Sequence, residues 1–108
     1  MQKQMIWLSY DLGVDGDYEN LYAWLDHKEA KECGDNVAAF KYDDLNDFEE
    51  KIKSDIEQHI SLRKNDRIYI IFQDNNQKMK GKFIFGGRKK APWSGYAVEK
   101  NGSIEDYL

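Results

Sequence analysis

The sequence predicts an α+β protein in which one antiparallel sheet carries two helices on one of its faces. Runs of alternating β-favouring residues indicate the strands, and two stretches with an apolar residue at every third or fourth position indicate the helices. Clusters of Gly, Asn and Asp separate these segments. A chain of 108 residues with 41% apolar and 33% charged side chains has the size and composition of a single domain. We expect this domain over residues 1–108, with a core at 1–87 and an extended tail at 88–108.

A strand and a helix are expected first. Residues 5–10 alternate β-favouring side chains, and both faces of this strand are apolar. Gly13 and Gly16 mark a loop, after which Asp17 is the expected N-cap of a helix at residues 18–27. The apolar stripe of this helix consists of Tyr18, Leu21, Tyr22 and Leu25.

A short hairpin and a second helix follow. Strands are expected at residues 30–33 and 37–42, on either side of the turn-forming residues 34–36. The expected N-cap of the second helix is Asp43 or Asp44. The apolar positions of this helix are Leu45, Phe48, Ile52, Ile56 and Ile60.

The last two strands are expected at residues 67–72 and 79–85, joined by a polar turn at 74–77. The resulting order is β-α-β-β-α-β followed by one extra strand. This order is that of the split βαβ arrangement, and it predicts a ferredoxin-like fold with an extra C-terminal strand.

One face of this sheet remains apolar after the helices have covered the other. Its expected side chains are Met5, Trp7, Tyr69 and Ile71. Because a self-complementary patch is most often buried by two-fold association, these residues predict the interface of a homodimer. The alternative is that residues 88–96, with Trp93 and Tyr96, fold back over the same face.

Cysteine usage and hydropathy predict the compartment. The single cysteine, Cys33, cannot form an internal disulfide, and the first apolar run is too short for a secretory or membrane-spanning segment. We therefore expect a cytoplasmic protein with no membrane partner.

Charge is distributed unevenly along the chain. Residues 1–66 carry 8 basic and 16 acidic side chains, whereas residues 67–108 carry 8 basic and 4 acidic ones. This local basic excess predicts an RNA- or DNA-binding region, in which an aromatic ring can stack on bases. Its residues are Lys78, Lys80, Lys82, Arg88, Lys89, Lys90 and Trp93. The alternative for the three alternating lysines is protection of an edge strand against aggregation.

Several short motifs resemble a known family. They are Ser9-Tyr10-Asp11-Leu12, Asp17-Tyr18-Glu19-Asn20-Leu21-Tyr22, Val37-Ala38-Ala39-Phe40 and Lys64-Asn65-Asp66-Arg67-Ile68-Tyr69. In pattern and spacing, about residues 5–73 are similar to the CRISPR-associated protein 2 family. The resemblance implies a ferredoxin-like homodimer that acts as a metal-dependent nuclease or as a DNA-binding scaffold. It also implies that Asp11 is a catalytic ligand of Mg²⁺ near the dimer axis.

Two functions follow from these observations. The first is a nucleic-acid-directed dimer, either a Mg²⁺-dependent endonuclease or an inactive relative. The second is a non-catalytic module that binds a protein partner through its sheet edge. For Asp11, the alternative role is to accept hydrogen bonds from nearby backbone amides. Residues 78–96 do not match the usual ending of the family, and the first helix lacks the basic face of many members.

Overall fold

The computed structural model describes residues 3–43 and 47–97. The described chain forms a five-stranded antiparallel sheet and two helices, which confirms the α+β class. Its elements are β1 (Lys3–Asp11), α1 (Tyr18–His27), β2 (Lys31–Glu32), β3 (Val37–Asp43), α2 (Phe48–His59), β4 (Arg67–Gln73) and β5 (Met79–Phe85). The strand order is β2-β3-β1-β4-β5, and every neighbouring pair is antiparallel. This order is consistent with a ferredoxin-like fold that carries one extra strand.

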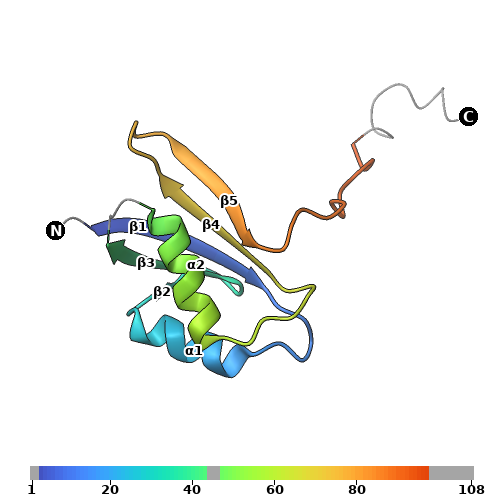
Figure 1. The fold of residues 1–108 in the computed structure, drawn as a ribbon. Coiled ribbons are helices and arrows are strands. Elements are labelled where there is room, and N and C mark those ends of the chain that lie inside the picture. Colours follow the sequence, from blue (N-terminus) through green and yellow to red (C-terminus); the bar gives the residue numbers. More distant parts are fainter. Residues whose placement is uncertain (1–2, 44–46, 98–108) are drawn as a thin grey trace, which may run out of the picture.

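Both helices lie on the same side of the sheet, where they cover the core (Figure 1). Alternation along the two central strands directs Ile6, Leu8, Ile68 and Ile70 toward the helices, and all four are fully buried. The helices contribute Leu21, Trp24, Leu25, Phe48, Ile52 and Ile56 to this core. The apolar spacing of three or four residues therefore predicted the buried positions Leu21 and Leu25 of α1 and the buried positions of α2. Tyr22, which was predicted in the stripe of α1, is 52% exposed.

Asp17 caps α1, as predicted. Its carboxylate accepts hydrogen bonds from the backbone N–H of Asn20, at 3.4 Å, and from the backbone N–H of Ser61, at 2.8 Å. The bond from Ser61, followed by those from Asn20, lowers the pKa of Asp17 below its usual value. The same side chain thus begins α1 and ties it to the segment that follows α2.

The predicted start of α2 is wrong. Asp43 is the last residue of β3, where it pairs with Lys3, so it cannot also cap a helix. The N-cap is Asp47, which has a left-handed φ of 65° and makes no side-chain capping bond. The other predicted cap, Asp44, and the first predicted apolar position, Leu45, lie outside the described residues.

The strand predicted at residues 30–33 is shorter, and forms only Lys31–Glu32. The N–H of Ala30 donates to the carbonyl of Leu25 at the end of α1, so it does not take part in the sheet. At the other end, the N–H of Cys33 closes the hairpin by donating to the carbonyl of Val37. The remaining strands match their predicted ranges to within two residues at either end.

A buried carboxylate connects the loops at one end of the sheet. Asp66, which is 2% exposed, accepts hydrogen bonds from the backbone N–H of Gly13 at 2.9 Å and of Arg63 at 2.8 Å. Gly13 follows β1 and Asp66 precedes β4. These bonds therefore fix the end of β1 against the beginning of β4.

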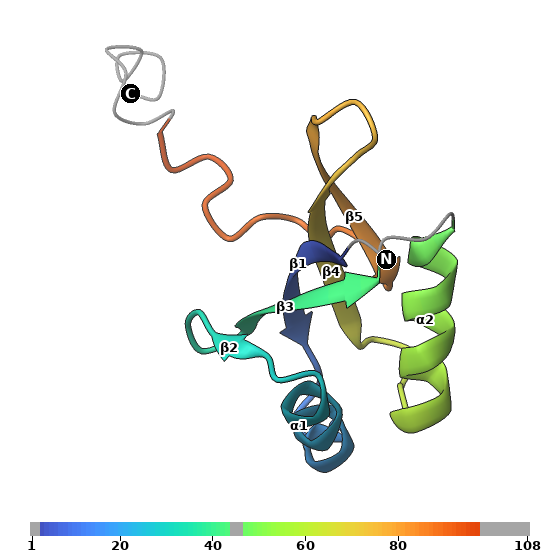
Figure 2. The same ribbon diagram turned by 90° about the vertical axis from the view of Figure 1, so that its left-hand side faces the viewer.

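The face of the sheet opposite the helices is called the open face below. Met5, Trp7 and Ile71 are partly exposed on it, at 37–39%, and Tyr69 is half-buried there. Residues 88–97 extend away from the sheet (Figure 2), and Trp93 and Tyr96 are exposed. The described part of the tail therefore does not cover the open face, and the rest of it lies outside the described residues. Neither helix in residues 3–43 and 47–97 has the length and apolar character needed to cross a membrane.

Candidate anion-binding site

A pocket lies on the open face where β1 ends and β4 begins. It has a volume of about 280 Å³ and is called the Arg67 pocket below. Its lining residues are Ser9, Asp11, Arg67, Tyr69, Phe83 and Arg88. Strand register brings five of them together, because Asp11 pairs with Arg67, Ser9 pairs with Tyr69, and Tyr69 pairs with Phe83.

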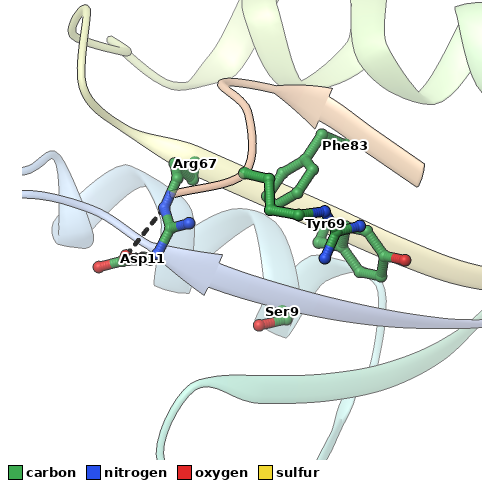
Figure 3. Close-up of a pocket in the computed structure, with 6 residues that line it drawn as sticks. Ser9, Asp11, Arg67, Tyr69 and Phe83 are labelled. Atoms are coloured by element: carbon green, nitrogen blue, oxygen red, sulfur yellow. Dashed lines mark hydrogen bonds and ion pairs between the residues drawn. The ribbon is translucent and has the colours of Figure 1, made fainter. Parts of the chain in front are cut away.

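An ion pair between Arg67 and Asp11 forms one end of the pocket (Figure 3). Nη2 and Nε of Arg67 donate to Oδ2 of Asp11 at 2.5 Å and 3.1 Å. Nη1 of Arg67 donates to the carbonyl of Gly87 at 3.4 Å. The Arg67 side chain is 24% exposed and that of Asp11 is 53% exposed. The guanidinium is therefore held in place from two sides while part of it stays accessible.

Two aromatic rings form the floor of the pocket. Tyr69 and Phe83 meet edge to face, with their ring centroids 4.7 Å apart. Cζ of Arg67 and Cζ of Arg88 lie 5.8 Å and 5.7 Å from the centroid of Phe83, within the range of cation–π contacts. The Phe83 ring thus contacts both guanidinium groups of the pocket.

Glycine residues in and after β5 make this arrangement possible. A Cβ atom at Gly81 would lie 2.1 Å from Oη of Tyr69, so the absence of a side chain allows Tyr69 to lie across β5. Gly86 has a φ of 74°, and a Cβ there would lie 2.7 Å from the carbonyl oxygen of Asp66. The close turn at Gly86 returns the chain toward Arg67, so that Arg88 reaches Phe83.

The described part of one chain does not offer a set of ligands for a metal ion. Asp11 is the only carboxylate of the Arg67 pocket, and Arg67 occupies one of its oxygens. Residues 3–43 and 47–97 hold no group of three His, Cys, Asp or Glu side chains suited to a metal. Within this pocket a Mg²⁺ ion would find one carboxylate, Asp11, so a further carboxylate would have to come from a second copy. The metal site stays a prediction.

The predicted lysines lie away from the Arg67 pocket. Lys80 and Lys82 pair in register with Phe72 and Ile70, so they project from the helix-covered side of the edge strand β5. Nζ of Lys80 lies 3.4 Å from Asp74, and Nζ of Lys82 lies 2.7 Å from Glu49, which raises the pKa of Lys82. Lys78 precedes β5, and its backbone N–H donates to Asp74. A role of these lysines in binding stays a prediction.

The basic residues of the tail continue from the pocket. Arg88 lines it, whereas Lys89, Lys90 and Trp93 follow in the exposed segment that leads away from the sheet. The structure thus brings Arg88 together with Asp11 and separates both from the lysines of β5.

Sequence reasoning missed Arg67 and Phe83 as candidate site residues, and assigned Tyr69 only to the dimer interface. The sequence did contain an indication that Arg67 lies beside Asp11. Asp11 ends the first strand, Arg67 begins the fourth, and these strands are antiparallel neighbours in the predicted fold. The position of Phe83 depends on a register shift between Ile68 and Tyr69, which no sequence pattern indicates.

Comparisons of the chain with models of protein families, with curated proteins and with solved structures found no match.

Proposed function

We propose that the protein is a ferredoxin-like homodimer that binds nucleic acid, similar to CRISPR-associated protein 2. The proposal rests mainly on the Arg67 pocket, in which two guanidinium groups lie beside two aromatic rings. Planar guanidinium groups match the geometry of phosphate oxygens, and aromatic and guanidinium planes stack on unpaired bases.

Local charge supports this choice of ligand. The chain has a formal net charge of −4, yet Arg67 and Arg88 outnumber the one carboxylate of the pocket. Lys89 and Lys90 extend the positive charge into the exposed tail, with Trp93 available for stacking. The site is therefore a positive region on an acidic protein, which favours a polyanion that binds at this region only.

The open face supports the dimer. Met5, Trp7 and Ile71 lie together on β1 and β4, with Trp7 and Ile71 in register. A second copy placed on this face would bury these apolar side chains, which are partly exposed in one chain. Such a dimer has to meet around Met5, Trp7 and Ile71, because Tyr69 lines the Arg67 pocket on the same face and must stay open to the nucleic acid.

Metal-dependent cleavage is a second candidate activity, supported by the position of Asp11 at the end of β1 beside the open face. Two Asp11 side chains, one from each copy, would hold Mg²⁺, which would polarise a phosphodiester and activate a water molecule. Incubation of labelled RNA and DNA with Mg²⁺ or Mn²⁺ tests this activity. Cleavage that survives Asp11→Ala would show that Asp11 is not the metal ligand.

Binding is tested by fluorescence anisotropy with labelled single-stranded DNA, single-stranded RNA and duplex DNA. We expect binding that weakens between about 50 mM and about 200 mM salt, because phosphate contacts release counterions. Replacing Arg88, Lys89 and Lys90 together by Gln should abolish it. Replacing Lys80 and Lys82 by Gln removes charge from the other side of the sheet, and serves as the control. The absence of any binding at low salt would reject the proposal and favour a protein partner instead.

A further inference from the structure

We infer that Asp11 is an internal counter-ion that occupies the Arg67 guanidinium until a phosphate of single-stranded nucleic acid replaces it. This inference rests on the proposed function, and adds to it the class of nucleic acid and the exchange that binding requires. Asp11 would then oppose binding, whereas a metal-ligand role would require Asp11 for activity.

The exchange follows from the geometry of the ion pair. Nε and Nη2 form the edge of the guanidinium with which arginine contacts carboxylates and phosphates, and both donate to Oδ2 of Asp11. A phosphate oxygen in the pocket would need the same two donors. Since the Asp11 side chain is 53% exposed, it can turn into solvent without burying an unpaired charge.

Arg67 would keep its position after Asp11 leaves. Nη1 donates to the carbonyl of Gly87, and the guanidinium lies over the Phe83 ring. Arg88 contacts the same ring and supplies a second positive charge. The pocket therefore offers two cationic groups to an anion, and one carboxylate, Asp11, competes with that anion.

The shape of the pocket favours a single strand. Its volume of about 280 Å³ is near the lower end of the range for small-ligand sites, which suits one nucleotide at a time. Its aromatic residues, Tyr69 and Phe83, lie on the pocket floor next to the arginines. In a duplex the bases are stacked inside the helix, so the phosphates could reach Arg67 and Arg88 but the bases could not reach this floor.

The test compares Asp11→Asn with Asp15→Asn. Both changes remove one negative charge, but the Asp15 side chain lies in the loop after β1 beside Arg63 and does not line the pocket. Anisotropy titrations use short single-stranded oligo(dT) and a duplex of the same length at one salt concentration. We expect Asp11→Asn to bind the single strand about three- to tenfold more tightly than the parent, and Asp15→Asn to remain within about twofold. Equal or weaker binding by Asp11→Asn would overturn the inference.

Arg67→Lys tests the role of the two donors, Nε and Nη2, of the guanidinium. Lysine keeps the charge but loses the paired donors, so Arg67→Lys combined with Asp11→Asn should lose the gain in affinity. If the parent binds, and Arg67→Lys leaves binding unchanged while loss of Arg88, Lys89 and Lys90 abolishes it, the proposed function stands and this inference falls. Preference for the duplex would also overturn it. If no variant binds at low salt, both fall.

Discussion

Tyr10 shows how a single residue links β1 to the hairpin between β2 and β3. Its hydroxyl donates to the carbonyl of Asp35 at 3.0 Å, and its ring contacts Tyr18 and Tyr22 edge to face. Burial, followed by the effect of Tyr22, raises the pKa of Tyr10 to about 12. The folded protein therefore holds this proton at a pH where the unfolded chain has released it.

Stability should fall as the pH rises from about 10, where tyrosine ionises in the unfolded chain, toward the pKa of about 12 in the folded state. Urea unfolding at increasing pH measures this loss, which should be smaller in Tyr10→Phe. At neutral pH, Tyr10→Phe should cost about 1 kcal/mol for the lost hydrogen bond. Tyr96→Phe changes an exposed ring and serves as the control. An equal loss of stability at alkaline pH in Tyr10→Phe and in the parent would contradict this account.

Asp66 has a structural role at the same scale. Asp66→Ala removes the buried carboxylate that accepts from the N–H groups of two exposed loop residues, Gly13 and Arg63, so it should cost about 2 kcal/mol of unfolding free energy. Thermal and urea unfolding measure this change. Asp15→Ala removes an exposed carboxylate from the adjacent loop and should change stability by less than about 0.5 kcal/mol. A loss of similar size in both variants would show that Asp66 does not connect the loops.

At the scale of elements, β4 and β5 bring together side chains that are distant in sequence. Gly81 provides space for Tyr69, and the register shift beside Tyr69 places Phe83 against it. The strand β5 therefore contributes to the pocket by its backbone as well as by its side chains.

Gly81→Ala should weaken oligonucleotide binding several-fold while changing stability by less than about 1 kcal/mol, because Tyr69 can rotate out of the way of the new methyl group. Anisotropy and urea unfolding measure the two effects on the same samples. Gly87→Ala is the matched control, since its Cβ would meet no atom within 4 Å. Unchanged binding in Gly81→Ala would show that the position of Tyr69 does not matter to the ligand.

Apolar periodicity was sufficient to predict the elements but not their ends. The start of α2 depends on Asp47 in a left-handed conformation, and the start of β2 depends on a bond from Ala30 to α1. Such features follow from tertiary contacts. The same holds for the site. Asp11 was predicted from the family resemblance and Arg88 from the local basic excess, whereas Arg67 and Phe83 depend on which strands pair and in which register.

At the scale of the whole molecule, the main feature is the open face, where apolar side chains stay partly exposed in one chain. Trp7 and Ile71 are 37% and 39% exposed on neighbouring strands, whereas the apolar residues of the same strands that face the helices are buried. A dimer formed through this face would place both Arg67 pockets on the same particle.

Sedimentation equilibrium should give about twice the chain mass of 12.7 kDa. Trp7→Lys places a charge in the proposed interface and should reduce the mass to that of one chain without changing the circular dichroism spectrum. Trp93→Lys alters an exposed residue of the tail and should leave the dimer intact. A parent protein that sediments at 12.7 kDa would reject the dimer.

The most direct test of the central claim is an NMR titration of the ¹⁵N-labelled protein with single-stranded oligo(dT), observing the Nε–H resonances of the arginines. Arg67 donates this proton to Asp11 in the free protein, so an exchange of Asp11 for phosphate must change its resonance. The account expects large shifts at Arg67 and Arg88 and small ones at Arg63. Shifts confined to residues around Lys80 and Lys82, with Arg67 unchanged, would contradict it.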